Sequence, residues 1–208
     1  MLLPSSTHTH WPEMSEPRPS AVVLAGPNGA GKSTAAPELL QGELAVREFV
    51  NADVIAQGLS AFAPAGAAVA AGRIMLARMS ELARQRVSFA FETTLASRSF
   101  APRLKALRAS GYSVHLLYLW LDSPDLAVQR VAHRVRSGGH DVPADVVVRR
   151  YHAGIRNLLA LYQPIVTTWA VYDCSGRESR LIAERLESSQ LRVYDGAAWE
   201  AVQRGGRA

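Results

Sequence analysis

The sequence predicts an α/β domain built on a mainly parallel sheet. Short apolar runs rich in β-branched residues alternate along the chain with longer segments that carry apolar residues at helical spacing. Residues 114–121 are apolar nearly throughout, as expected of a strand that is covered on both faces. With 208 residues, of which 48% are hydrophobic, the chain can form one such domain with a buried core. We expect a single domain at 20–208, preceded by a flexible N-terminal tail at 1–19.

Five strands are expected, because five short apolar runs each end at a glycine or a polar residue. They lie at 20–25, 43–50, 87–91, 114–121 and 170–173. The first four runs are followed by a glycine-rich segment from Gly26, by Asp53, by Glu92 and by Asp122. Because the carboxyl ends of parallel strands lie at one edge of a sheet, these polar groups are expected along one ligand-binding edge.

Helices are expected between the strands. One runs from 98 to 110 and is stopped by Gly111, and another starts at Ser123-Pro124 and runs to about residue 136. The other helical segments are 35–40, 64–86, and a segment from 144 towards 169 that is interrupted at Pro164. The last part of the chain, 180–202, predicts a small hairpin and a terminal helix.

A phosphate-binding motif follows the first strand. Residues 26–33 read GPNGAGKS and match G-x-x-x-x-G-K-[ST] in full, with a strand before and a helix after. Such a loop points backbone N–H groups inward, and the helix N-terminus favours an anion. We expect Lys32 to act on the β- and γ-phosphates of ATP and Ser33 to ligate Mg²⁺. The predicted nucleotide-binding residues of this loop are Gly26, Pro27, Asn28, Gly29, Ala30, Gly31, Lys32, Ser33 and Thr34.

Two carboxylates at strand ends are candidates for binding and activating an acceptor. Asp53 would face the γ-phosphate, where a kinase needs a group that orients or deprotonates the acceptor hydroxyl; alternatively, it caps the following helix. Glu92 and Thr94 combine an acid and a hydroxyl, which suits a sugar or polyol acceptor; alternatively, Glu92 is a solvated loop acid. Arg98, at the start of the next helix, is assigned to the acceptor with them.

A cluster of arginines predicts a helical lid at about 124–160. Six arginines and only two acids lie between residues 130 and 156, and Gly138-Gly139 separates two helical segments. Guanidinium groups neutralise the charge of a phosphoryl group in transfer. Arg134 and Arg149 are predicted to be catalytic, and Arg130, Arg134 and Arg150 to bind the nucleotide. The alternative is a set of surface arginines in an arginine-rich chain.

Composition narrows the choice of partners. The net charge of +5 favours anionic ligands, but aromatic residues make up only 7% of the chain, so a single-stranded nucleic acid is not the expected partner. The one cysteine, Cys174, excludes a disulfide framework and a four-thiolate zinc site. No apolar run is long enough to span a membrane. We therefore expect a cytoplasmic protein with no membrane partner.

These motifs together resemble the zeta-toxin family of P-loop kinases, over about residues 20–175. The motifs that carry the resemblance are GPNGAGKST at 26–34, NAD at 51–53, FETTL at 91–95, the arginine pair Arg130 and Arg134 leading to GGHDVP at 138–143, and RRY at 149–151. The resemblance implies a P-loop NTPase fold flanked by helices, with a helical lid. Similarity to nucleotide and shikimate kinases further implies a five-stranded, mainly parallel sheet in the order 2-3-1-4-5.

The resemblance also implies an activity. Zeta toxins transfer the γ-phosphoryl group of ATP to the 3′-hydroxyl of UDP-N-acetylglucosamine, and a small helical antitoxin blocks their nucleotide site. By this resemblance Asp53 is the catalytic base, Glu92 binds the acceptor sugar, and lid arginines contact the phosphates. The chain is shorter than the best-known toxins and lacks the arginine and His-Pro that they carry after the base. It is closer to a short, UDP-N-acetylglucosamine kinase-like branch.

The expected function is therefore that of a kinase that uses ATP and Mg²⁺. Its acceptor would be a hydroxyl group of a small metabolite, such as a nucleotide sugar, and an antitoxin protein is a further expected partner. Two alternatives share the phosphate loop: a polynucleotide 5′-kinase, and a non-catalytic regulator that binds ATP.

Overall fold

The computed structural model describes residues 18–37, 39–40, 46–60, 63–139, 141–187 and 189–207. The expected N-terminal tail lies almost entirely outside these residues. The strands are β1 (Ser20–Ala25), β2 (Glu48–Val50), β3 (Phe89–Thr93), β4 (Ser113–Trp120), β5 (Thr168–Asp173), β6 (Arg180–Arg185) and β7 (Arg192–Val193). The helices are α1 (Lys32–Pro37), α2 (Ala52–Leu59), α3 (Ala68–Arg84), α4 (Phe100–Ala109), α5 (Pro124–Arg136), α6 (Ala144–Asn157) and α7 (Gly196–Arg207), with a 3₁₀ turn η2 (Pro64–Ala67) and a π-helical turn η3 (Leu158–Tyr162).

The strands form one mixed sheet in the order β2-β3-β1-β4-β5-β6-β7. The first five are parallel, which confirms the order 2-3-1-4-5. The expectation of a five-stranded sheet is wrong, because the C-terminal hairpin continues the sheet beyond β5. β6 pairs antiparallel with β5, and β7 pairs antiparallel with β6. Without them the apolar strand β5, which is buried along its whole length, would be an exposed edge.

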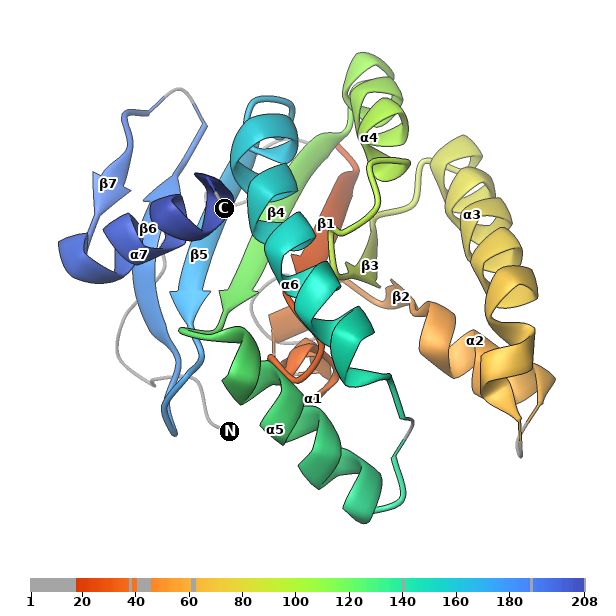
Figure 1. Ribbon diagram of the computed structural model, residues 1–208. Helices are drawn as coiled ribbons and strands as arrows, with labels where there is room; N and C mark the ends of the chain where they lie inside the picture. The colour runs from red at the N-terminus through yellow and green to blue at the C-terminus, as the bar shows by residue number, and fades with distance from the viewer. Residues whose placement is uncertain are drawn as a thin grey trace.

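The core lies on both sides of the central strands. β1 is buried at all six residues and β4 at all but its first, as the continuous apolar runs predicted. At the C-terminal side, the rings of Trp169 and Trp199 stack at 5.6 Å and join α7 to the sheet. Figure 1 shows α1, α2 and α5 beside the carboxyl ends of the parallel strands, where the predicted motifs lie. Among the described helices, none is long and apolar enough to cross a membrane.

Several boundaries differ from the sequence expectation. The third strand begins at Phe89 rather than at Val87, because α3 ends in a turn at residues 85–86, where Arg86 adopts a left-handed φ of 56°, and the chain joins the sheet only after residue 88. The segment at 64–86 divides into η2 and α3. The second strand is only 48–50, and the expected start at 43–45 lies outside the described residues. The helix from 144 ends at 157 and continues as η3 before Pro164. The helix expected at 124–136 is confirmed.

The expected lid is anchored at its C-terminal end. Tyr151 on α6 donates a hydrogen bond to the Leu121 carbonyl at 2.7 Å, and Asn157 donates to the Leu95 carbonyl at 2.8 Å and to the Ala96 carbonyl at 3.1 Å. A Cβ atom added at Gly154 would lie 2.6 Å from the Thr94 carbonyl oxygen, so only glycine allows α6 to approach this closely. The end of α6 therefore supports the loop that follows β3.

We expect Gly154→Ala to lower the free energy of unfolding by roughly 1–3 kcal/mol, because the new methyl group must displace the Thr94 backbone or the Tyr118 hydroxyl. Gly58→Ala is the matched control: a Cβ atom at this exposed position of α2 meets nothing, so the substitution is expected to stabilise by up to about 1 kcal/mol. Urea unfolding of the three proteins measures both effects. Equal stability of the two variants would contradict the close packing of α6.

Acid is expected to destabilise the fold through His115. This residue lies in β4, its Nδ1 atom is 2.8 Å from the Thr168 hydroxyl, and burial lowers its pKa to about 4. Since the unfolded chain takes up the proton near pH 6.5, the unfolded state binds more protons between pH 6.5 and 4. The contribution of neutral His115 to the free energy of unfolding is thus fully present above pH 6.5. It is lost as the pH drops from 6.5 to 4, which lowers the free energy of unfolding by at most about 3 kcal/mol. The unfolding temperatures of the native protein and of His115→Gln, measured from pH 7 to pH 4, check this prediction. If both temperatures fell in parallel with pH, His115 would not be the cause.

Candidate active site

The phosphate loop has the backbone that its glycines predicted. Gly26, Gly29 and Gly31 have φ values of 143°, 82° and 85°, in the region that favours glycine. A Cβ atom at Gly26 would lie 2.3 Å from the Leu119 carbonyl oxygen, and one at Gly29 would lie 2.9 Å from that of Ala127. The loop is therefore pressed between the end of β4 and the start of α5, and larger residues do not fit.

Lys32 folds back onto this loop. Its Nζ atom donates hydrogen bonds to the carbonyl oxygens of Gly26 and Pro27, both at 2.8 Å, and only 5% of the residue is exposed. Burial lowers the pKa of Lys32, whereas the nearby carboxylates of Glu92 and Asp53 act to raise it. Arg134 also acts on this pKa and lowers it, which brings that predicted lid residue within electrostatic reach of Lys32.

Glu92 joins the phosphate loop to the second strand. One of its carboxylate oxygens, Oε2, accepts hydrogen bonds from the Ser33 hydroxyl and from Asn51 Nδ2, each at 2.8 Å. The other oxygen lies 3.6 Å from Lys32 Nζ. The sequence assigned Glu92 to the acceptor, and the alternative was a solvated loop acid. The second is wrong, because only 12% of the side chain is exposed. Glu92 lies beside the predicted magnesium ligand.

Asn51, and not Asp53, caps helix α2. The Asn51 side chain accepts hydrogen bonds from the backbone N–H groups of Asp53 at 2.8 Å and Val54 at 3.3 Å. Asp53 occupies the first turn of α2 and is exposed. Within the described part of the chain, no hydrogen bond or ion pair engages its carboxylate. The Asp53 carboxylate is thus available to another molecule.

A cavity of about 640 Å³ is lined by seven of the predicted residues. Asn28 and Lys32 line its phosphate end, and Asp53, Glu92 and Thr94 line it at the strand ends. Arg149 and Arg150 reach it from the N-terminal half of α6. The volume lies within the range of small-molecule sites in proteins.

Several other predicted residues do not line this cavity. Arg130 donates hydrogen bonds to the carbonyl oxygens of Cys174 at 2.8 Å and Ser175 at 2.7 Å, so it ties α5 to the end of β5. Arg98 is exposed and does not line the cavity. Arg134 packs its side-chain stem against Gly139, where a Cβ atom would lie 2.5 Å from Arg134 Cγ. Thr34 is exposed in the first turn of α1.

Sequence reasoning missed one wall of the cavity. Val69, Gly72, Arg73 and Leu76 form a single face of α3, and all four line it. The available signal was Gly72, a helical glycine at which a Cβ atom would meet nothing, so no contact within the fold requires a glycine there. Ser97, Ser99 and Phe100, after β3, complete this wall.

The residues present fit Mg²⁺ and a nucleotide. Ser33 and Glu92 offer oxygen atoms, the donors that Mg²⁺ prefers, and their side chains already touch. Magnesium usually keeps waters and nucleotide oxygens as its other ligands, so a closed set of protein ligands is not required. Among the described residues, no group of three or more His, Cys, Asp or Glu side chains could hold a metal ion by itself.

The fold and the site together define a P-loop protein with a kinase-like α/β architecture. The sequence profile of a family described as an AAA domain matches residues 22–157, more than half of the chain, and the chain belongs to this family. An uncharacterized protein of Haemophilus influenzae is 32% identical over 131 residues, which make up 63% of this chain and 91% of that protein.

Two solved structures show the same fold. The structure described as AvrRxo1-ORF1:-ORF2 with ATP has a TM-score of 0.74 at 17% identity, over 89% of this chain and 63% of that chain. The PezAT chromosomal toxin–antitoxin system of Streptococcus pneumoniae has a TM-score of 0.64 at 16% identity, over 94% and 88%. The chain thus spans less than two thirds of the AvrRxo1 chain that it matches. These likenesses confirm the zeta-toxin-like kinase fold expected from the motifs.

Proposed function

We propose that this protein transfers the γ-phosphoryl group of ATP to a hydroxyl group of a small metabolite. The observation that supports this most is the arrangement of the 640 Å³ cavity. A buried lysine of the phosphate loop lies at one end, and the unengaged carboxylate of Asp53 lies on the adjoining wall. A kinase needs these two groups on either side of the phosphoryl group that moves.

Each residue has a role in this proposal. The loop from Gly26 to Thr34 holds the phosphates, and Lys32 leaves its carbonyl partners to contact the β- and γ-phosphate oxygens. Ser33 would hold Mg²⁺ with Glu92 beside it, and the bound ion would neutralise phosphate charge. Asp53 orients the acceptor hydroxyl and accepts its proton. Arg134, Arg149 and Arg150 stabilise charge on the phosphoryl group during transfer.

The acceptor half of the cavity is suited to a hydroxylated, anionic molecule. Thr94, Ser97 and Ser99 supply hydroxyl groups, and Arg73 supplies a positive charge from the wall formed by α3. A nucleotide sugar such as UDP-N-acetylglucosamine has both features. The PezAT toxin–antitoxin system among the similar structures supports a protein antitoxin as a further partner, one that would act by covering the nucleotide end. The buried free thiol of Cys174 is consistent with a cytoplasmic location.

Labelled ATP tests the proposal directly. Purified protein is incubated with γ-labelled ATP and pools of metabolites and nucleotide sugars, with Asp53→Asn as the control. A labelled small molecule formed only by the native protein is the expected result. Label at the 5′ ends of oligonucleotides, in amounts that fall steeply with salt, would instead indicate a polynucleotide kinase. Tight ATP binding without transfer to any pool would indicate a regulator.

A further inference from the structure

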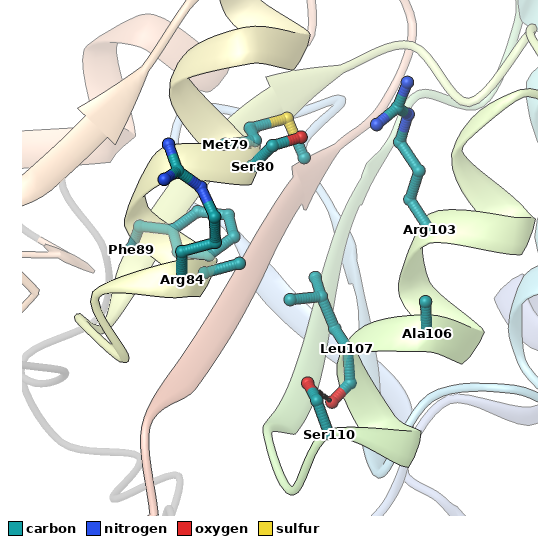
Figure 2. Close-up of a pocket in the computed structure, with 9 residues that line it drawn as sticks. Met79, Ser80, Arg84, Phe89, Arg103, Ala106, Leu107 and Ser110 are labelled. Atoms are coloured by element: carbon teal, nitrogen blue, oxygen red, sulfur yellow. Dashed lines mark hydrogen bonds between the residues drawn. The ribbon is translucent and has the colours of Figure 1, made fainter.

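A second cavity, of about 360 Å³, lies between α3 and α4 (Figure 2). Phe89, the first residue of β3, lines it, whereas the candidate active site lies at the other end of this strand, at Glu92 and Thr94. The two cavities therefore follow one another along the same pair of helices. No residue of the second cavity has a role in the proposed kinase reaction.

The interior of this cavity is apolar and its frame is fixed. Met79, Phe89 and Leu107 line it and are each less than 9% exposed. The hydroxyl groups of Ser80 and Ser110 are used by the helices themselves, since they donate to the carbonyl oxygens of Leu76 and Leu107. Arg86, just after α3, donates a hydrogen bond from Nη1 to the Ser110 carbonyl at 2.9 Å, and this bond joins the C-terminal ends of α3 and α4. An apolar body of a ligand thus meets a preformed surface.

Two arginines give the cavity its charge. Arg84 comes from α3 and Arg103 from α4, and Figure 2 shows them on opposite sides of the cavity. Neither has an ion pair or hydrogen bond within the described residues. Glu81, the acid on the nearby turn of α3, is already bonded to Arg78 at 3.0 Å. The cavity therefore presents two uncompensated positive charges beside an apolar floor.

We propose that this α3–α4 cavity is a binding site for a small amphiphile: a molecule with an aromatic or alkyl body and one carboxylate. The body packs on Ala83 and Leu107, one from each helix, and the carboxylate is held by Arg84 and Arg103. The same helices line the candidate active site through Arg73 and Phe100. An occupant would therefore fix the spacing of α3 and α4 next to the acceptor.

Calorimetric titration with 4-phenylbutyrate and its uncharged counterpart 4-phenylbutanol tests this site. A parallel titration contains the non-hydrolysable analogue AMP-PNP and Mg²⁺. The analogue fills the phosphate loop, so any acid that binds in its presence binds elsewhere. We expect phenylbutyrate to bind about tenfold or more tightly than the alcohol, because charge-assisted hydrogen bonds favour the acid. The double variant Arg84→Gln/Arg103→Gln should lose this preference. Lys105→Gln/Arg136→Gln removes two exposed cations that do not line the cavity, and should keep it.

Hydrogen exchange then locates the bound acid. Slower exchange at 79–84 and 103–110 in the native protein, and no slowing in the double variant, is the expected pattern. Three results would overturn the proposal: equal affinity for acid and alcohol, unchanged acid binding in the double variant, or no saturable binding up to about 10 mM. None of these results bears on phosphoryl transfer, so the two proposals stand or fall separately.

Discussion

Replacing Asp53 with asparagine is expected to slow phosphoryl transfer by roughly 10²–10⁴-fold while ATP binding stays close to that of the native protein. The carboxylate lines the cavity but has no partner in the described fold, so its loss removes a proton acceptor and little else. Since Asn51 caps α2, the substitution leaves the helix start intact. Initial rates with a labelled acceptor and calorimetric titration with AMP-PNP measure the two quantities.

Asp125→Asn is the matched control for this variant. Asp125 is also an exposed acid in the first turn of a helix, but it does not line the cavity. We expect its transfer rate to equal that of the native protein. If transfer and nucleotide affinity fell together in Asp53→Asn, Asp53 would have a structural role and the proposed base would have to be found elsewhere.

Lys32→Ala is expected to lower nucleotide turnover by at least about 10²–10³-fold and, unlike Asp53→Asn, to weaken ATP binding as well. Lys32 supplies the only lysine charge in the phosphate loop, and it also faces Glu92 at 3.6 Å. Removal of a buried cation leaves the Glu92 carboxylate with its hydrogen bonds from Ser33 and Asn51 but without its ion-pair partner.

Thermal unfolding must accompany this measurement, because a variant that unfolds would also lose turnover. The double variant Lys32→Ala/Glu92→Gln removes both charges and is expected to unfold close to the native temperature while remaining inactive. Lys105→Gln, on the exposed face of α4, is the control for the loss of a lysine. Native turnover in a folded Lys32→Ala protein would exclude the phosphate loop from the reaction.

The phosphate loop and the parallel half of the sheet could be predicted from the sequence because their signals are local. The spacing of Gly26, Gly31 and Lys32 determines a backbone that few other residues can adopt, and the apolar run of β4 determines a covered strand. The hairpin of β6 and β7 was also expected. Its addition to the edge of β5 was not, because pairing with a strand is set by tertiary contacts rather than by its own sequence.

The candidate site was predictable only where its residues follow strands. Asp53, Glu92 and Thr94 were found in this way, and the cavity contains all three. Arg73 was missed, because its place depends on how α3 packs against α2. Arg130 was assigned to the nucleotide together with Arg134, but its side chain instead binds the Cys174 and Ser175 carbonyl oxygens. A cluster of arginines in a sequence predicts an anionic ligand, but it does not show which of the arginines contact that ligand.

The most direct test of the central claim is a crystal structure of the protein with AMP-PNP and Mg²⁺. The account predicts that Lys32 Nζ leaves the Gly26 and Pro27 carbonyl oxygens for the β- and γ-phosphates, with Ser33 on the metal ion. It also predicts that the Asp53 carboxylate faces the γ-phosphate across the cavity. A nucleotide bound away from the loop, or an Asp53 side chain directed out of the cavity, would contradict it.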